Sequence, residues 1–443
     1  EKGAAENGVD KKKASEVFDL LEKFANYGFN KSHAAAYAVV SYQTGWLKAN
    51  HPVEFMAGVM NCDIHLTDKL AIYFEEVRKG LKLPWVPPCV NRSLATFDVV
   101  DGELVYALGA LKNVGLEAMN LVVTGRRTGD NGVQSSDPAG RDTPFATIFD
   151  FARRVNLKQI GKRPLEMMAR AGAFDQLDRN RRRIFDSLDA LVAYSAAVHE
   201  QKASAQVSLF GEAGDDLPEP RLSPVPDWLP AERLAEEFKA VGFYLSGHPL
   251  DDYMSNLKRQ QVMTLEEVHA RAMSGPLVAK LAGVVAGRQE RKSARGNRFA
   301  FAQLSDPSGA YEVTLFSEAL EKAREHLETG SKVMVTVEAT MESDQLKLLG
   351  RGVVPLDGAV AQGVPSGLKI YVEDQRALPQ IARILTRACE QLPKAARGPV
   401  HLCLAHAGLP GEVEMDLQQD FPVSPEIRGA VKSLDGVLTV EDL

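Results

Sequence analysis

The stretch Asn297–Ser305, with the sequence NRFAFAQLS, alternates large and small side chains along its length. An extended strand would place Phe299, Phe301 and Gln303 on one face and the small residues between them on the other. Small side chains suit the crowded interior of a narrow barrel. We therefore predict an outward aromatic face, while the opposite arrangement, with the phenylalanines in the core, stays open on this pattern.

The segments around this strand complete a recognisable layout. A turn at Asp306–Gly309 joins it to the next strand, and a helix near Ser317–Glu328 follows that strand. Five strands with a helix between the third and the fourth are typical of an OB barrel. The predicted strands are Leu277–Glu290, Asn297–Ser305, Ala310–Phe316, Lys332–Met341 and Gln345–Val354.

Basic residues gather at the first hairpin of this predicted barrel, with Glu290 as the one acid among them. Aromatic side chains beside a basic hairpin suit the stacking of nucleic-acid bases, which contributes about 1–3 kcal/mol per base. We therefore predict that this region contacts single-stranded DNA. The predicted DNA-binding residues of the barrel are Arg288, Lys292, Arg295, Arg298, Phe299 and Phe301, and Arg291 belongs to the same basic cluster.

The first 205 residues are mostly helical, and Leu108–Gly115, LGALKNVG, opens one of the helices. It is similar to the hairpin of a helix-hairpin-helix motif, which aims backbone N–H groups at a phosphate. Asn113 stands where glycine is usual, and asparagine tolerates left-handed backbone angles. An ordinary turn between helices is the alternative, as it is for the weaker candidate Ile160–Arg163. The predicted DNA contacts are Gly109, Lys112, Asn113, Val114 and Gly115.

A short apolar pair, Leu209-Phe210, lies between an Ala-rich helical stretch and an acidic segment spaced by prolines. Because the flanking sequence offers it no evident core, the pair is a candidate for burial in a partner protein, where a few anchors supply most of the binding energy. The alternative is a frayed helix end packed on its own domain. The predicted docking peptide is Gln206, Val207, Ser208, Leu209 and Phe210.

The last 75 or so residues, 365–443, follow the order strand, helix, strand, strand, helix, strand. This β-α-β-β-α-β order predicts a ferredoxin-like sandwich or a relative of one. The whole chain is therefore expected to be a multidomain α+β protein. The expected domains are a helical segment 1–82, a helix-hairpin-helix domain 83–205, a connecting region 206–275, the OB-fold domain 276–356 and a C-terminal α/β sandwich 365–443.

Composition narrows the functional classes. The formal net charge of −7 argues against a uniformly basic nucleic-acid coat, although Gly109–Ala190 carries 14 basic against 10 acidic residues. The four scattered cysteines form no CxxC pair, and no phosphate loop, GxSxG elbow or cluster of metal ligands is present. No apolar run approaches the ~20 residues of a membrane helix. We therefore expect no catalytic residues and no metal site in this chain, and a cytoplasmic location.

Several segments resemble the bacterial family C replicative DNA polymerases, the polymerase III alpha subunits. Phe24–Tyr37 and Ser41–Lys48 resemble the end of their fingers domain, and Tyr244–Pro249 resembles the segment just before their OB domain. Arg295–Arg298 and Asp306–Gly309 are similar to that family's OB hairpins. The resemblance runs collinearly through essentially the whole chain, and its fingers segment is long enough to be specific.

This resemblance implies most of the expected functions. It implies that Gln206, Leu209 and Phe210 bind the sliding clamp (the beta subunit), that the OB fold touches single-stranded template, and that the C-terminal domain binds the clamp-loader tau subunit. Primer-template DNA is the other expected nucleic-acid partner. By the same resemblance, Lys31 and His33 could face the incoming nucleotide or the template. The alternative is that they only cap and pack their helix. The palm carboxylates, the Mg²⁺ they bind and the contact with the proofreading epsilon subunit belong to preceding domains of that family.

We therefore expect a piece of a longer polymerase, inactive alone, that supplies processivity and template handling. The chain begins with Glu1 rather than methionine, in keeping with this expectation. The first alternative is a stand-alone nucleic-acid-binding scaffold that combines a helix-hairpin-helix with an OB fold. A second is an aminoacyl-tRNA synthetase, which is disfavoured because no ATP-binding signature accompanies the barrel.

Overall fold

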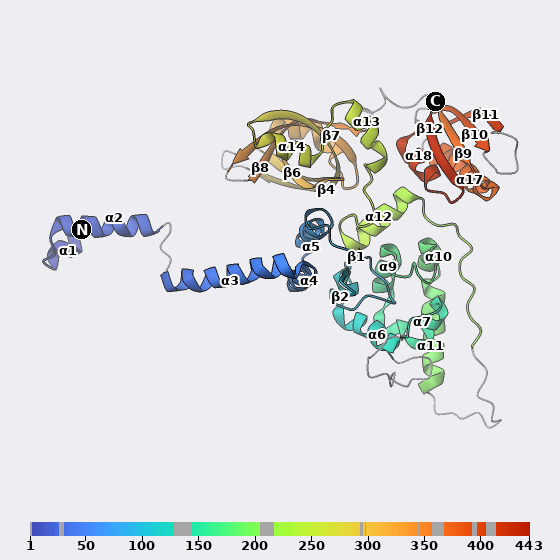
Figure 1. The fold of residues 1–443 in the computed structure, drawn as a ribbon, viewed down its shortest axis with the longest axis horizontal. Coiled ribbons are helices and arrows are strands. Elements are labelled where there is room, and N and C mark those ends of the chain that lie inside the picture. Colours follow the sequence, from blue (N-terminus) through green and yellow to red (C-terminus); the bar gives the residue numbers. More distant parts are fainter. Residues whose placement is uncertain are drawn as a thin grey trace.

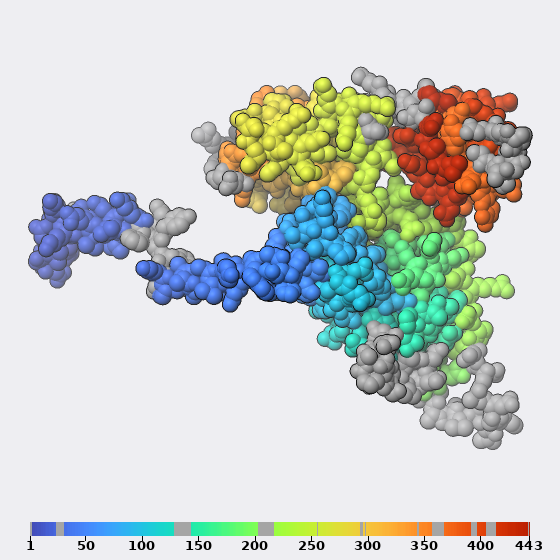
Figure 2. All heavy atoms as spheres, viewed as in Figure 1, coloured from blue at the N-terminus to red at the C-terminus, as the bar shows by residue number. Residues whose placement is uncertain are grey.

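The computed structural model describes residues 2–25, 31–127, 143–203, 217–292, 296, 298–342, 345–356, 367–391, 397–404 and 413–443. Figure 1 shows a helical body in the lower part of the view, with a barrel and a small α/β domain above it and an arm of helices leading to the N-terminus. The space-filling view has the same outline, and the helical arm extends from the rest of the molecule (Figure 2). A multidomain α+β architecture is confirmed.

The arm contains α1 (Lys2–Glu6), α2 (Lys11–Ala25) and α3 (Lys31–Asn50), after which α4 (Pro52–Cys62) enters the helical body. Apolar side chains of α2 are exposed, with Val17 55% and Leu21 61% accessible. On α3, Tyr42 and Trp46 are 72% and 47% accessible. The apolar residues of these two helices therefore have no core within the described part of the chain.

One hydrophobic core joins α4 to the predicted helix-hairpin-helix domain. It runs from Met56 to Leu245 and includes the fully buried Phe74, Tyr106 and Phe151. The elements of this body after α4 are α5 (Thr67–Glu75), a π-helix η1 (Glu76–Gly80), β1 (Trp85–Val86), β2 (Asp98–Val100), β3 (Glu103–Val105), the 3-10 helix η2 (Leu108–Ala110), α6 (Leu116–Arg127), α7 (Ile148–Arg154), α8 (Leu157–Ile160), α9 (Lys162–Ala171), α10 (Arg181–Asp186), α11 (Leu188–Ala203) and α12 (Pro230–Val241).

The described part of the acidic linker lies along this body. The Ser223 backbone N–H donates to Ser187 Oγ at 2.8 Å, and Asn180 donates to the Val225 carbonyl at 2.8 Å. Further along, α12 packs on α9, and the buried Glu237 accepts the backbone N–H groups of Leu245 and Ser246. Residues 217–245 thus add a packed irregular segment and the helix α12 to the helix-hairpin-helix core.

The barrel is closed, and its strands follow the order β4-β5-β6-β8-β7. A helix, α15 (Ser317–Ala323), continued by the 3-10 turn η4 (Arg324–His326), separates the third strand from the fourth. This confirms the OB-like layout expected from the sequence. The strands are β4 (Leu277–Lys292), β5 (Arg298–Asp306), β6 (Gly309–Phe316), β7 (Lys332–Glu342) and β8 (Gln345–Pro355).

A small joint connects the helical body to the barrel through η3 (Asp251–Tyr253), α13 (Met254–Arg259) and α14 (Leu265–Ala272). Leu250 and Leu257 pack there against Val284 on the outside of β4. At the far side, the Asp306 carboxylate accepts the backbone N–H of Leu265, at the first turn of α14, at 2.6 Å. The predicted turn Asp306–Gly309 therefore joins two strands and also anchors α14.

The C-terminal domain has the predicted order of elements: β9 (Leu368–Val372), the 3-10 turn η6 (Gln375–Ala377), α17 (Leu378–Gln391), β10 (Arg397–Leu404), β11 (Val413–Pro422), α18 (Pro425–Lys432) and β12 (Val437–Asp442). Its sheet follows the order β11-β10-β9-β12, and β9 and β10 are parallel neighbours. In the ferredoxin-like split arrangement another strand would separate them. The domain is therefore a relative of that sandwich, because α17 returns the chain directly beside β9.

Candidate nucleic-acid interface

The aromatic face of β5 lies on the outside of the barrel. Ala300, Ala302 and Leu304 are at most 1% accessible and form part of the core, whereas Phe299 and Phe301 are only half-buried. The outward arrangement predicted for the two phenylalanines is therefore the one that the structure shows.

A third aromatic ring joins this face. The register pairs Phe299 with Phe316 on β6, and Phe316 is 55% accessible. The ring centroids of Phe299 and Phe301 are 5.4 Å apart, and those of Phe299 and Phe316 are 6.2 Å apart. Together with the Arg291 guanidinium, 5.5 Å from the Phe301 ring centroid, they form what we call the aromatic face. Exposed rings beside a cation can stack on bases.

The predicted basic residues of the hairpin divide between two sides. Arg291 pairs across the ladder with Phe299 and shares its face. Arg288 pairs instead with the core-facing Ala302, contacts Glu290 at 3.2 Å and donates to the Arg324 carbonyl at 2.8 Å. It is therefore engaged away from the aromatic face. Lys292 and Arg298 pair with each other in the register and are exposed on the side of Arg288. Arg295 lies outside the described residues.

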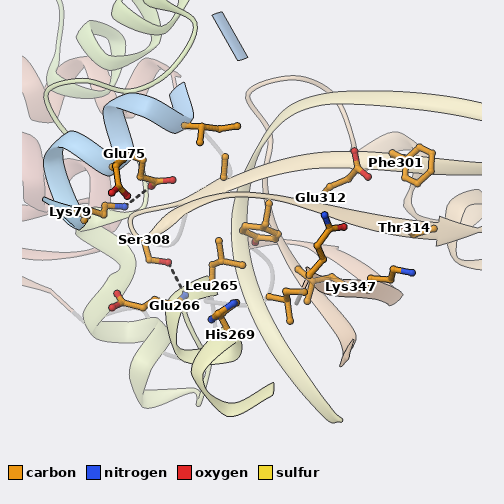
Figure 3. A pocket seen from close by; sticks show the side chains of 18 residues that line it. Glu75, Lys79, Leu265, Glu266, His269, Phe301, Ser308, Glu312, Thr314 and Lys347 are labelled. Atoms are coloured by element: carbon orange, nitrogen blue, oxygen red, sulfur yellow. Dashed lines mark hydrogen bonds and ion pairs between the residues drawn. The ribbon is translucent and has the colours of Figure 1, made fainter. Parts of the chain in front are cut away.

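An acidic groove borders the aromatic face. It has a volume of about 850 Å³ and lies between α5 with η1, α14 and the strands β6 and β8 (Figure 3). Phe301 and Thr314 stand at one end of it, and Glu75, Lys79 and Glu266 stand at the other. Its acidic lining residues outnumber its lysines, and one of those lysines, Lys79, is paired with Glu75 at 2.8 Å. Phosphates would be repelled here, so this groove limits the aromatic face on one side.

The first predicted hairpin places its two glycines in different environments. Gly109 is buried, and its N–H donates to the Ala95 carbonyl at 3.0 Å. Gly115 is exposed, and a Cβ added there would meet no atom within 4 Å. Asn113 has φ +60°, so the left-handed angle expected of it is present. Gly115 directly precedes α6, whose first N–H groups have no intrahelical partners and are open to an anion.

Lys112 and Val114 belong to the inner side of the same hairpin. The Lys112 N–H donates to the Ala240 carbonyl at 2.7 Å, and its ammonium lies 5.6 Å from the Phe238 ring centroid on α12. Val114 is 7% accessible. Both residues therefore fasten the hairpin to the body, and the side of the hairpin that faces solvent consists of Asn113 and Gly115.

The second candidate hairpin forms a tight turn between α8 and α9. Gly161 has φ +86° and separates the two helices, and Lys162 and Arg163 follow it at the start of α9. Both basic residues are exposed, although Lys162 is paired with Asp189 at 2.7 Å. The turn thus presents a helix N-terminus beside basic side chains, as a phosphate contact requires.

A buried histidine holds the barrel against the helical body. His248 is 7% accessible, its Nδ1 accepts the Leu250 N–H at 3.2 Å, and its Nε2 lies 3.1 Å from Ser305 Oγ. Burial, with help from the nearby charges of Lys79 and Arg78, lowers the pKa of His248 to about 3. The imidazole is therefore neutral, and with Nδ1 accepting, Nε2 carries the proton and donates to Ser305.

Two absences hold for the described part of the chain. No helix there is long and apolar enough to cross a membrane. No group of three or more histidine, cysteine, aspartate or glutamate side chains is placed to hold a metal ion among those residues.

Comparison with known proteins gives the chain its relatives. A family model described as helix-hairpin-helix motif matches residues 82–184, and one described as OB-fold nucleic acid binding domain matches residues 279–354. The chain is 41% identical, over its whole length, to the DNA polymerase III subunit alpha of Caulobacter vibrioides (strain NA1000 / CB15N), of which it covers 37%. The chain is therefore a homologue of part of the DNA polymerase III alpha subunits.

Other DNA polymerase III alpha subunits give the same picture. The Escherichia coli (strain K12) subunit is 36% identical over 90% of this chain and 33% of that protein, and the Vibrio cholerae subunit is 36% identical over 84% and 31%. The chain thus spans about a third of the length of these relatives. Among solved structures, the mitochondrial single-stranded DNA binding protein Rim1 of S. cerevisiae is 23% identical over 18% of this chain and 95% of that chain, with a TM-score of 0.17.

Of the remaining residues expected from the polymerase III alpha resemblance, the structure describes only Lys31 and His33, which lie on the N-terminal arm (Figure 1). Gln206 to Phe210 lie outside the described residues. Lys31 and His33 are exposed at the start of α3, and the His33 ring lies 4.5 Å from the Tyr37 ring. Phe316 was missed by the sequence reasoning, although counting back along the two strands from the Asp306–Gly309 turn pairs it with Phe299.

Proposed function

We propose that this chain is the C-terminal part of a DNA polymerase III alpha subunit and that it holds DNA for a catalytic centre located in the preceding domains. The aromatic face of the barrel would bind the single-stranded template. The hairpins at Gly115 and Gly161 would contact the phosphates of the primer-template duplex.

The aromatic face is the observation that carries this proposal. Three phenylalanines, one 55% accessible, lie outside a closed barrel whose interior is already filled by other apolar side chains. Exposing such rings to water is unfavourable unless a ligand covers them. Bases stack on aromatic rings at about 1–3 kcal/mol each, and Arg291 beside Phe301 supplies a cation for the strand.

The test is the binding of a fluorescent oligothymidylate to the full chain and to the variant Phe299→Ala/Phe301→Ala/Phe316→Ala. Loss of stacking for even one base, about 1–3 kcal/mol, predicts a decrease in affinity of at least roughly 5–100-fold. The matched control is Phe18→Ala on α2, a phenylalanine 60% accessible on the N-terminal arm. Equal affinities for the wild type and the triple variant would contradict the proposal.

The attachments to other replication proteins are part of the same proposal. Gln206 would hydrogen-bond at the rim of a pocket on the sliding clamp, with Val207 and Ser208 as spacers, and Leu209 and Phe210 would fill that pocket. The C-terminal domain, residues 365–443, would bind the clamp-loader tau subunit. Collinear identity to polymerase III alpha subunits supports both assignments.

The catalytic activity belongs to the longer protein. There, DNA-directed DNA synthesis from dNTPs would use Mg²⁺ held by palm carboxylates, and the epsilon subunit would bind the same preceding part. This chain alone should extend no primer, and it should work in the cytoplasm, where the chromosome is copied. A stand-alone helix-hairpin-helix/OB scaffold is the second candidate, which an upstream reading frame without palm aspartates would favour.

A further inference from the structure

We propose that the barrel carries a second binding site for the sugar-phosphate backbone of single-stranded DNA, in a basic groove away from the aromatic face. The groove lies between α13, α14 and the outer side of β4 and β7, and its volume is about 640 Å³. This inference rests on the proposed function, because it extends the path of the same strand.

The charge of the groove is the first observation. Lys258, Arg271 and Lys280 all line it and are exposed. None of the three has a side-chain ion pair among the described residues, although most other basic side chains of the barrel, such as Arg288 and Arg351, do. Unpaired cations that converge on one hollow favour an anionic ligand.

The one acidic residue among the described lining residues does not neutralise the groove. Glu267 belongs to the capping box of α14, where its Oε2 accepts the Thr264 N–H at 2.9 Å. The remaining polar lining consists of neutral side chains, including Gln260, Gln261 and Thr336, that can hydrogen-bond to phosphate or sugar oxygens. With three cations and one acid, the groove has a net positive charge.

The position of the groove on β4 favours DNA over an acidic protein as its occupant. Lys280 lies on the outer side of β4, paired with Thr336 of β7, and Arg291 of the aromatic face lies on the outer side of the same strand. The two are 11 residues apart along β4, or about 36 Å of extended strand. A bound strand that reaches both must be longer than one that covers the aromatic face alone, and it stays within the ~4–16 nucleotides known for OB folds.

The test compares two oligothymidylates, one of about 4 and one of about 20 nucleotides, on the full chain. In the variant Lys258→Gln/Arg271→Gln/Lys280→Gln, the long oligonucleotide should bind about tenfold or more weakly at 0.1 M salt, whereas the short one should keep its affinity. The slope of log K against log salt for the long oligonucleotide should become less steep by about 2, since each contact to single strands contributes about 0.7.

The control removes the same charge elsewhere. Lys11→Gln/Lys12→Gln/Lys13→Gln neutralises three exposed lysines of α2, far from the barrel along the N-terminal arm (Figure 1). The inference would be overturned if the groove variant binds the long oligonucleotide as tightly as the wild type does, or if it loses affinity equally for both lengths. It would also be overturned if the α2 control loses as much affinity as the groove variant. The variant Phe299→Ala/Phe301→Ala/Phe316→Ala separates this inference from the proposed function, because it should weaken the binding of the short oligonucleotide. Unchanged binding of the short oligonucleotide by that variant would contradict the proposed function and not the basic groove.

Discussion

Replacing Gly109 by alanine should destabilise the helical body, because the hairpin there is packed and not open. A Cβ added at Gly109 would lie 2.4 Å from Leu116 Cδ2 and 2.5 Å from the Ala95 carbonyl oxygen. Ordinary contacts are about 3.5–4.0 Å, and the Ala95 oxygen is held by its bond with the Gly109 N–H at 3.0 Å. Overpacking of this kind costs about 1–3 kcal/mol.

Thermal unfolding followed by calorimetry measures this cost, since a domain of this size loses roughly 2–4 °C of Tm for each kcal/mol. Gly115→Ala is the matched control in the same hairpin. Its Cβ meets nothing within 4 Å, so stability should change by less than about 0.5 kcal/mol. If the hairpin faces a phosphate, Gly115→Ala should instead weaken binding to duplex DNA severalfold. Equal stability of the two variants would refute this assignment of the glycines.

Two further predictions concern the joint and the docking peptide. Burial lowers the pKa of His248 to about 3, against about 6.5 in the unfolded chain. The unfolded state therefore binds one more proton than the folded state as the pH falls from about 6.5 towards 3, and the free energy of unfolding declines in that window. The Tm of His248→Gln should fall less than that of the wild type over the same range, and an equal fall would contradict this prediction. Changing Gln206, Leu209 and Phe210 to alanine should weaken clamp binding at least about tenfold by surface plasmon resonance, since such anchors carry most of the energy, and unchanged affinity would exclude the docking assignment.

Local patterns were sufficient to predict the barrel. Alternation in Asn297–Ser305 and a turn at Asp306–Gly309 determine the face and the register of β5 and β6. The same information would have found Phe316. The position of Arg288 was harder to predict, because an irregularity in the ladder between Val285 and Gly287 changes which side the following residues take.

In other parts of the chain, long-range packing limited what could be predicted from the sequence. The sequence shows two glycines in one hairpin, but only the approach of Ala95 and Leu116 shows that Gly109 is a packing residue. The order of elements in the C-terminal domain was predicted, whereas the placement of β10 beside β9 depends on how α17 crosses the sheet. The basic groove was likewise invisible, since Lys258, Arg271 and Lys280 come from three separate elements.

The binding of single-stranded DNA on the aromatic face can be mapped by photocrosslinking. The full chain is bound to an oligonucleotide that carries 5-iododeoxyuridine, irradiated, and mapped by mass spectrometry. Crosslinks are expected on the β5 and β6 peptides that contain Phe299, Phe301 and Phe316. Crosslinks confined to other parts of the chain, with none on these two strands, would contradict binding on the aromatic face.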